Sequence, residues 1–485
     1  MDSIWSQTCQ IEARKALSGD LKTEVAVIGA GMAGVLIASA LQEAGKQVVV
    51  LEAERIAGGQ TRNTTAKLTS QHGMIYRKLW KTLGEARARQ YAMANEAALA
   101  EFRRVIARRE IDCDLQTQDA FVYGDDAEEL RDEAECASAL GLPASFAEQT
   151  ALPFPAAGAV RFARQAQFHP LKFLKAMAEP LSILEHTRVQ EAEEHRLVTE
   201  HGTVTAEKIV FACHYPFVNF PGLYFARMHQ ERSYVLALEH APAMDGMWIF
   251  ADGAAKAYSF RTWRRLLLLG GGGHRCGENS AGGRYDALRR QARAWFPQSR
   301  EAAHWSAQDC VTPDGVPYIG RYAASRPDWY VATGFQKWGM TGSMVSAMLL
   351  RDLISGRENP CAQVFDPGRF DGETLPGVLA ESGQAVKGLA KRVFQIPAET
   401  AGQLAPGHGG VVFLEGEKLG VYKDEDGTLY PVELQCPHLG CQLEWNPDEK
   451  SWDCPCHGSR FDRFGTLISG PAQTGTHART EKRID

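Results

Sequence analysis

A glycine-rich turn between two apolar segments constrains the fold of this chain more than any other feature of its sequence. Residues 24–52 comprise an apolar segment, a turn with Gly29, Gly31 and Gly34, a segment with helical periodicity, and a second apolar segment that ends at Glu52. In such a turn the first glycine permits a tight bend, and the third lets the helix pack closely on the preceding strand. The pattern predicts one βαβ unit and hence an α/β fold.

The same turn predicts a site for an ADP-containing cofactor. Gly31 lets the backbone approach a pyrophosphate, which the N-terminus of the following helix would face with its partial positive charge. The carboxylate of Glu52 can accept hydrogen bonds from the ribose hydroxyls of an adenosine, whereas it would repel a 2′-phosphate. A purely structural glycine turn is the alternative interpretation, because such turns are common.

Four of the eleven cysteines lie close together near the C-terminus, in the boxes CPHLGC (436–441) and CPCHGS (454–459). In a reducing compartment, clustered cysteines indicate metal or redox chemistry before structural stapling. Two thiolates can hold one iron of a [2Fe-2S] cluster while two imidazoles hold the other. We therefore expect the ligands Cys436, His438, Cys454 and His457. Zinc is the alternative, because it binds the same side chains.

Three further segments resemble the D-amino-acid oxidase-like FAD-dependent oxidoreductases. They are AGGQTRNTTAK after the second apolar segment, TPDGVPYIG, and ATGFQKWGMTGS. The resemblance extends over about Glu24 to Ile354 and implies FAD as the cofactor. Beyond the glycine turn and Glu52, the residues that it places at the cofactor are Gly58, Gly59, Thr61, Val189, Gly334, Gly339, Met340 and Thr341.

The two cysteine boxes resemble those of Rieske [2Fe-2S] proteins. That resemblance implies a disulfide between the remaining pair, Cys441 and Cys456, and a hydrogen bond from Ser459 to the cluster. Phe461 stands where those proteins often have tyrosine, so one hydrogen bond to a cluster thiolate is expected to be missing. Fusions of this flavin fold with a C-terminal Rieske domain form a bacterial family that the chain resembles from end to end.

The expected fold class is α/β plus a small all-β domain, because 485 residues exceed one compact core. A Rossmann-like FAD domain with an antiparallel substrate sheet would occupy residues 1–356. Its FAD-binding parts are expected at about 22–75, 155–220 and 305–356, and its substrate sheet at about 228–304. A connector at 357–400 and a Rieske domain at 401–485 would follow. The polar residues after Pro471 predict a short or frayed tail in place of a closing strand.

Tyr258, Arg261 and His72 are the candidate catalytic residues. Tyr258 and Arg261 lie in AYSFRTW, within the segment from which this superfamily builds its substrate wall. His72 lies in SQHG, a segment that is expected to pass near the flavin ring. A structural role is the alternative for each of the three.

The two cofactors together predict a dehydrogenase. Flavin takes two electrons from an organic donor, whereas the cluster carries one. We expect oxidation of an amine, amino acid or related small molecule at a CH–NH or CH–OH group, with electrons leaving through the cluster to an acceptor protein or a quinone. Two alternatives remain: an NAD(P)H-dependent or other reductase that feeds the cluster, and a non-catalytic redox sensor.

Charge and hydropathy exclude several partners. The net charge of −6 is spread along the chain without a basic block, so a nucleic-acid partner is not expected. No apolar stretch has the length of a membrane span. The N-terminal residues lack the apolar core of a signal peptide, and a cytoplasmic protein is therefore expected.

Overall fold

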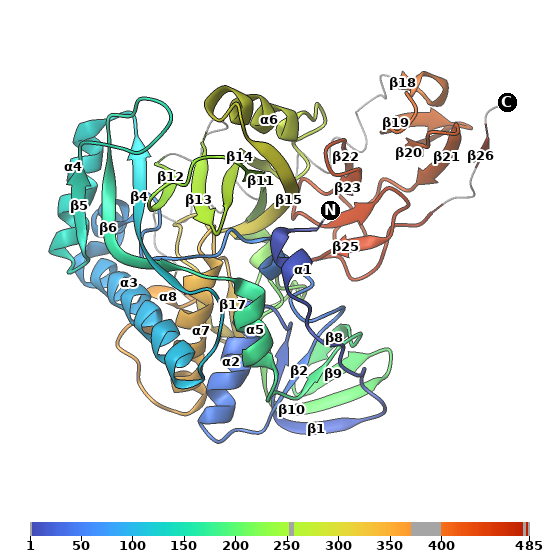
Figure 1. Ribbon diagram of the computed structural model, residues 1–485. Helices are drawn as coiled ribbons and strands as arrows, with labels where there is room; N and C mark the ends of the chain where they lie inside the picture. The colour runs from blue at the N-terminus through green and yellow to red at the C-terminus, as the bar shows by residue number, and fades with distance from the viewer. Residues whose placement is uncertain (1, 252–256, 370–398, 479–481, 484–485) are drawn as a thin grey trace.

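The computed structural model describes all residues except 1, 252–256, 370–398, 479–481 and 484–485. Two large sheets and their helices form the first three quarters of the chain, and two small sheets form the remainder (Figure 1). Most of the expected connector at 357–400 lies outside the described residues. None of the described helices combines the length and the apolar character that a bilayer crossing requires.

The first sheet is built around the predicted βαβ unit, β1 (Leu21–Ile28), α2 (Met32–Glu43) and β2 (Val48–Leu51). Its strand order is β16-β17-β10-β1-β2-β7, and β1, β2, β7, β10 and β17 run parallel. The last four residues of β1 are all buried, as is typical of parallel strands covered on both faces. The remaining strands are β7 (Ile183–Leu184), β8 (Val189–Glu193), β9 (Arg196–Thr199), β10 (Gly202–Phe211), β16 (Tyr318–Ala323) and β17 (Arg326–Thr333).

Helices cover this sheet and extend to the second one. Helices α2 and α7 pack against each other, and α5 packs against α2. Within α3 the helix is interrupted at Gly84, which has a φ of 80°. The other helices are α1 (Ile4–Thr8), η1 (Gln60–Asn63), α3 (Ile75–Arg108), α4 (Ala127–Ala139), α5 (Pro170–Ala178), η2 (Tyr224–Ala226), α6 (Arg284–Trp295), α7 (Gly339–Ile354) and α8 (Ala362–Phe365).

The second sheet is largely antiparallel, as predicted for the segment after Met228. Its order is β15-β11-β14-β13-β12-β4-β6-β3, with β5 paired to β6. The pair β12 and β4 is parallel and joins two distant parts of the chain. The strands are β3 (Lys67–Leu68), β4 (Gln116–Gly124), β5 (Ala144–Ala147), β6 (Gly158–Gln167), β11 (His229–Glu239), β12 (Met247–Phe250), β13 (Ser259–Trp263), β14 (Leu266–Arg275) and β15 (Arg300–Val311).

The C-terminal domain consists of two small sheets. They are ordered β18-β19-β20-β21-β26 and β22-β23-β24-β25. The expectation for the polar tail was wrong in part, because β26 pairs with β21 and closes the first of these sheets. The elements are β18 (Glu399–Thr400), η3 (Ala401–Gln403), β19 (Gly409–Leu414), β20 (Glu417–Lys423), β21 (Thr428–Val432), β22 (Glu444–Asn446), β23 (Ser451–Asp453), β24 (Arg460–Asp462), β25 (Leu467–Ser469) and β26 (Lys482–Arg483).

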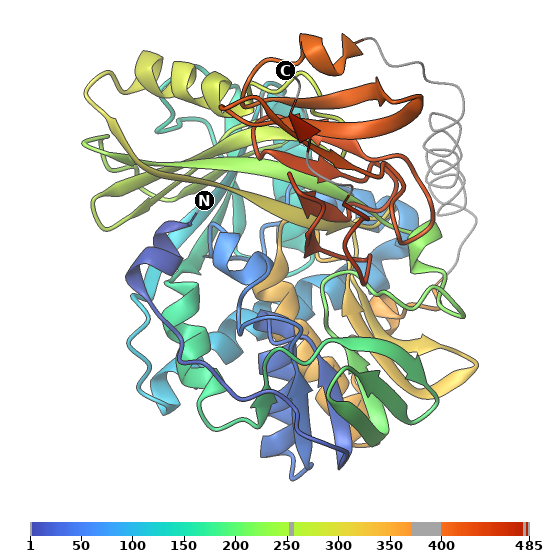
Figure 2. The same ribbon diagram turned by 90° about the vertical axis from the view of Figure 1, so that its right-hand side faces the viewer.

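This domain, orange to red in Figure 2, packs against β11, β15 and the loop after β14. The side-chain amide of Gln230 donates to the carbonyl of His457 at 2.6 Å, and that of Gln308 donates to the carbonyl of Gly458 at 2.7 Å. Gly277 lies directly on Pro455. The contacts therefore reach the second cysteine box itself.

Candidate cofactor and metal sites

A cavity of about 370 Å³ lies between the carboxyl ends of the parallel strands and the second sheet. Ligands of open α/β sheets bind at this edge. Of the residues that the sequence places at the cofactor, those that line the cavity are Gly29, Gly31, Glu52, Gly58, Gly59, Thr61, Val189, Gly339 and Met340. Segments far apart in the sequence thus meet at one site.

The glycine turn is packed so closely that side chains do not fit. Gly29 has a φ of 103°, and a Cβ there would lie 2.7 Å from the carbonyl oxygen of Ala212. A Cβ at Gly34 would collide with the carbonyl of Gly29. Gly34 does not line the cavity, which agrees with a packing role for the third glycine. The turn leaves backbone at the cavity surface, as a pyrophosphate requires.

Glu52 lies at the end of β2 with its carboxylate beside this turn. Its two oxygens accept hydrogen bonds from the backbone N–H groups of Ala30 (2.7 Å) and Glu54 (2.9 Å). Burial raises the pKa of this carboxyl above its usual value. The side chain therefore both holds the turn in place and presents acceptor atoms at the cavity.

Besides Gly34, two of the expected cofactor residues do not line the cavity. Gly334 forms a turn with a φ of 74°, and a Cβ there would clash with Thr312. The hydroxyl of Thr341 points instead toward β3, where it donates to the carbonyl of Thr69 at 2.9 Å. Gly334 lies in the turn before α7, and Thr341 lies in the first turn of that helix. Gly339 and Met340, which lie between them, face the cavity.

Of the three candidate catalytic residues, Tyr258 lines the cavity. Arg261 does not, because its fully buried guanidinium is bound within the protein. It donates to the Gln167 side chain and to the carbonyls of Ala66 and Phe168, at 2.8–2.9 Å. The structure thus does not bring Arg261 to the cavity, and its hydrogen bonds tie β13 to neighbouring segments.

The structure does not bring His72 to the cavity either. Its imidazole is buried behind Trp338, with the two rings stacked at 4.8 Å between centroids. One nitrogen donates to the carbonyl of Thr69 at 2.8 Å, and the other accepts from the hydroxyl of Tyr91 at 2.6 Å. Burial lowers the pKa of His72 to about 3, so the ring is neutral. His72 supports a cavity residue and does not reach the cavity.

Two ionisable groups with strongly shifted pKa values line the cavity and were missed from the sequence. The ammonium of Lys67, at the start of β3, donates to the carbonyl of Trp248 at 3.2 Å. Burial, together with the nearby cations Arg261 and Lys337, lowers the pKa of Lys67 to about 7. Burial also raises the pKa of Asp309, on β15, to about 7. Lys67 lies within the segment AGGQTRNTTAK, which was a usable signal, whereas nothing local marks Asp309.

The two cysteine boxes form the same closed turn. In each, the N–H of the first cysteine donates to the carbonyl of the sixth residue, at 2.9 Å in the first box and 2.8 Å in the second. In each, the N–H of the fifth residue, a glycine in the left-handed region, donates back to the carbonyl of the first cysteine. The first box lies between β21 and β22 and the second between β23 and β24. Matching turns thus present their side chains to one space.

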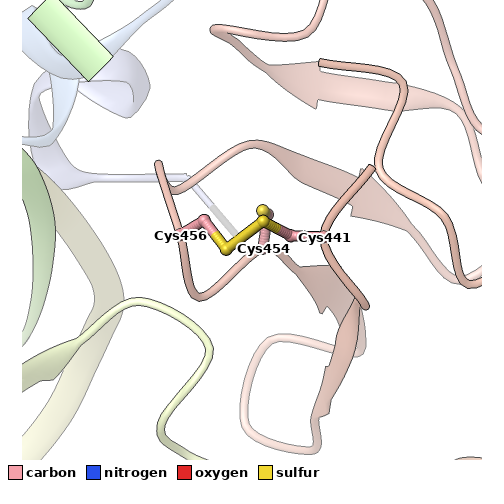
Figure 3. A group of neighbouring side chains, drawn as sticks. All are labelled: Cys441, Cys454 and Cys456. Carbon is pink, nitrogen blue, oxygen red and sulfur yellow. A yellow bond between two sulfur atoms is a disulfide. The ribbon is translucent and has the colours of Figure 1, made fainter. Parts of the chain in front are cut away.

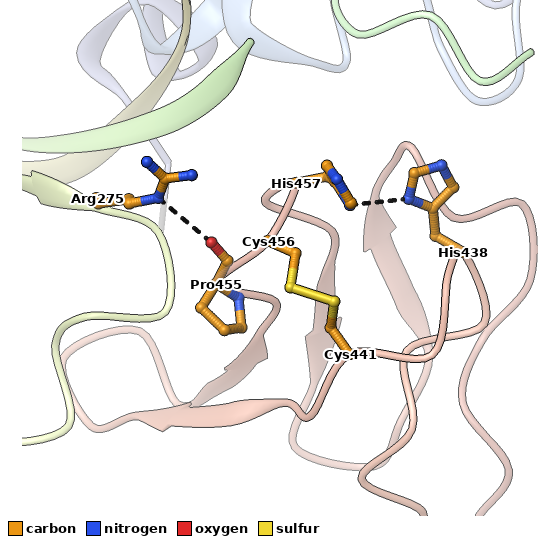
Figure 4. Close-up of a disulfide and its surroundings, with 6 residues drawn as sticks. All are labelled: Arg275, His438, Cys441, Pro455, Cys456 and His457. Carbon is orange, nitrogen blue, oxygen red and sulfur yellow. Dashed lines mark hydrogen bonds between the residues drawn. A yellow bond between two sulfur atoms is a disulfide. The ribbon is translucent and has the colours of Figure 1, made fainter. Parts of the chain in front are cut away.

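The four expected ligands meet in pairs in that space. The Nδ1 atoms of His438 and His457 lie 3.2 Å apart (Figure 4). Two nitrogens bound to one tetrahedral metal ion at about 2.1 Å would lie about 3.4 Å apart. The thiols of Cys436 and Cys454 hydrogen-bond each other, which lowers the pKa of Cys436 and raises that of Cys454. One pair of thiols and one pair of imidazoles match the donor set of a Rieske cluster.

A disulfide joins Cys441 and Cys456 beside these ligands (Figure 4). The pairing implied by the Rieske resemblance is confirmed. Three sulfurs, those of Cys441, Cys454 and Cys456, gather within 4.8 Å (Figure 3). Two of them are consumed by the disulfide, so of these three only Cys454 can supply a thiolate.

Comparison with known proteins agrees with both sites. Residues 24–353 match the family model described as FAD dependent oxidoreductase, and residues 395–479 match the Rieske [2Fe-2S] domain. A Bacillus subtilis protein, YhfW, whose name describes a Rieske 2Fe-2S iron-sulfur protein, is 35% identical over 488 residues. That match covers 97% of this chain and 96% of YhfW.

Solved structures share the fold of the first domain. The L-proline dehydrogenase of P. horikoshii has a TM-score of 0.60 at 16% identity, covering 73% of this chain and 98% of that one. The glycine oxidase of Geobacillus kaustophilus has a TM-score of 0.57 at 20% identity, covering 73% of this chain and 100% of that one. With the family matches, these findings settle the class: the chain belongs to the FAD-dependent oxidoreductases, carries a C-terminal Rieske domain, and uses FAD and a [2Fe-2S] cluster.

Proposed function

We propose that this protein is a dehydrogenase that oxidises the CH–NH group of a small amino acid or amine. Conversion of CH–NH to C=N removes two electrons and two protons from the substrate. FAD supplies the chemistry that takes both electrons, and the cluster carries one at a time. Two molecules of a one-electron acceptor, a small protein or a quinone, are therefore reduced in each turnover.

The observation that carries this proposal is a wall shared by the two domains. Residues 468–473 of the Rieske domain line the flavin cavity. The N–H of Ala472, in this wall, donates to the Ser459 hydroxyl at 3.0 Å, and that hydroxyl hydrogen-bonds the Cys436 sulfur. Two hydrogen bonds thus separate the cavity from a cluster ligand. A flavoenzyme that passed its electrons to oxygen would have no use for this contact.

We assign the cluster ligands from the donor atoms that face each other, and the FAD site from the residues that line the cavity. Cys436 and Cys454 hold one iron, and His438 and His457 hold the other, because their donor atoms face each other in these pairs. The FAD site consists of the predicted residues that line the cavity, with Glu52 at the adenosine ribose.

The substrate is proposed to bind against the second sheet. Tyr258 and Asp309 face the cavity from this sheet, and Lys67 faces it from β3. In the described part of the chain, Lys67 forms no ion pair, and its ammonium has donors beyond the one bound to Trp248. A substrate carboxylate can accept from them. Asp309, with its raised pKa, is suited to take the proton of a substrate ammonium.

The experiment that tests the proposal follows both chromophores after anaerobic mixing with a panel of amino acids and amines. In the wild type, a substrate is expected to bleach the flavin first and the cluster afterwards. Cys454→Ser removes a cluster ligand, so this variant is expected to bleach its flavin at the wild-type rate and to lose reduction of an external one-electron acceptor.

Cys361→Ser is the matched control, because Cys361 is buried in the flavin domain and does not line the cavity. It is expected to reduce the acceptor like the wild type. If NADH reduced the cluster and no amine or amino acid reduced the flavin, the protein would be an NADH-dependent reductase and not the proposed dehydrogenase. Zinc found in place of iron would overturn the assignment of a [2Fe-2S] cluster to these ligands.

A further inference from the structure

One loop of the flavin domain runs from the cavity to the cluster histidines. The loop follows β10, and Ala212, Cys213, His214, Tyr215 and Phe217 line the cavity. Two residues beyond Phe217, the side-chain oxygen of Asn219 lies 2.8 Å from Nε2 of His438. A residue of one domain thus contacts a proposed metal ligand of the other.

This hydrogen bond fixes which nitrogen of His438 carries the proton. An amide oxygen can only accept, so Nε2 of His438 donates to Asn219. A neutral imidazole has one N–H group, and its Nδ1 atom is therefore left with a lone pair. Nδ1 is the atom that lies 3.2 Å from Nδ1 of His457. Asn219 selects the form of His438 that can bind iron through Nδ1.

The flavin domain holds Asn219 in place. Its carbonyl accepts from the N–H of Leu223 at 3.0 Å. The hydroxyl of Tyr322, on β16, donates to the carbonyl of Val218, and the guanidinium of Arg227 donates to that of Gly222. These contacts anchor the loop on both sides of Asn219, so its side-chain oxygen is a fixed dipole.

We propose that Asn219 is a positioning residue that sets the reduction potential of the cluster. A hydrogen-bond acceptor on the far nitrogen of a metal-bound imidazole orients the ring and makes it a stronger donor to the metal. A stronger donor stabilises the oxidised cluster and lowers its potential. The flavin domain therefore supplies part of the environment that fixes the potential of the Rieske centre.

Two substitutions of Asn219 in the full-length protein test this inference in opposite directions. Asn219→Asp places a stronger acceptor at the same atoms and is expected to lower the midpoint potential. Asn219→Leu removes the acceptor at similar volume and is expected to raise it. The measurement is an EPR-monitored redox titration with mediators and dithionite, which requires no substrate and stands even if the proposed reaction is wrong.

Asn279→Leu is the matched control at the same interface. Asn279 donates to Asn446 (3.1 Å) and Asp448 (2.9 Å) of the Rieske domain. Among the described residues, it forms no hydrogen bond with either cluster histidine. This variant weakens docking without touching an imidazole and is expected to keep the wild-type potential.

Two outcomes would overturn the inference. One is equal potentials in the Asn219→Asp, Asn219→Leu and wild-type proteins at equal cluster content. The other is the same shift in Asn279→Leu as in Asn219→Leu, which would assign the effect to docking. The nitrogen hyperfine couplings of the histidine ligands, measured by pulsed EPR, are expected to change only in the Asn219 variants.

Discussion

At the scale of single residues, Lys67 makes the proposed substrate site dependent on pH. Its pKa is lowered to about 7, so the ammonium loses its proton as pH rises through that value. Binding of a carboxylate is therefore expected to weaken above about pH 7. The measurement is the perturbation of the flavin spectrum on titration with a non-reacting carboxylate, repeated between pH 6 and 9.

Two variants of Lys67 and one control test whether this side chain causes the pH dependence of carboxylate binding. Lys67→Arg keeps a charge throughout the range and is expected to remove the part of the pH dependence that arises from Lys67. The part that arises from ionisation of Asp309, whose pKa is raised to about 7, is expected to remain. Lys67→Met loses a charge-assisted hydrogen bond and is expected to bind roughly 10- to 150-fold more weakly at pH 6. Lys208→Met, at a half-buried ion pair with Asp328 that lies away from the cavity, serves as the control. Unchanged affinity in Lys67→Met would exclude this lysine from the substrate site.

Residues whose partners lie nearby in the sequence could be predicted from the sequence. Gly29 and Glu52 lie within one βαβ unit, and their roles follow from spacing alone. Arg261 and His72 could not be predicted. The acceptors of Arg261 come from Ala66 and Phe168, 195 and 93 residues away in the chain. A sequence pattern shows that such a side chain is polar, but not that its hydrogen bonds are already made within the protein.

At the scale of elements, the loop between β14 and α6 packs against the second cysteine box. Gly277 has a φ of 75°, and a Cβ there would lie 2.6 Å from the backbone of Pro455. Gly277→Ala is therefore expected to displace the box and slow electron transfer from the flavin to the cluster. The measurement is the rate of cluster bleaching after rapid anaerobic reduction of the flavin.

Gly283→Ala provides the control within the same loop. Gly283 has a φ of 79°, and a Cβ there would meet nothing within 4 Å. Both variants carry the backbone cost of a side chain in the left-handed region, about 1–3 kcal/mol. Only Gly277→Ala adds the clash with the Rieske domain. Equal rates in the two variants would show that this contact does not govern electron transfer.

Element order was predictable where periodicity and glycine turns are strong, as in β1, α2 and β2. The second sheet was predictable only in part. Its antiparallel strands after Met228 follow from short apolar runs, but the parallel pair β12 and β4 joins segments more than 120 residues apart. Strand β26 was missed because Lys482–Arg483 has no apolar pattern, and its pairing is through the backbone.

At the scale of the whole molecule, a buried group of ion pairs connects the flavin domain with the Rieske domain. Arg232 of β11 lies 3.7 Å from Asp453 and 3.8 Å from Glu449, and Arg460 pairs with both carboxylates. Arg232→Met leaves excess negative charge buried, which costs roughly 3–5 kcal/mol. Calorimetry is expected to show a lower unfolding temperature and separate transitions for the two domains.

Arg289→Met is the control for this change. Arg289 pairs with Glu301 on the surface, where both side chains are more than a quarter exposed. Removal of such a pair costs about 0–1 kcal/mol. A thermogram of Arg232→Met that matched this control would show that the buried charges do not hold the domains together. Docking of this kind could not be predicted from the sequence, because its partners are about 220 residues apart.

The wall at 468–473 has a consequence for how the protein acquires and keeps its flavin. Because the C-terminal domain forms that wall, a nascent chain presents an open flavin cavity until the last domain has been synthesised and has docked. Docking then adds residues 468–473 to the lining of the cavity. Bound FAD is therefore expected to exchange with free flavin more slowly once the C-terminal domain has docked, and a variant that loosens the interface is expected to exchange it faster.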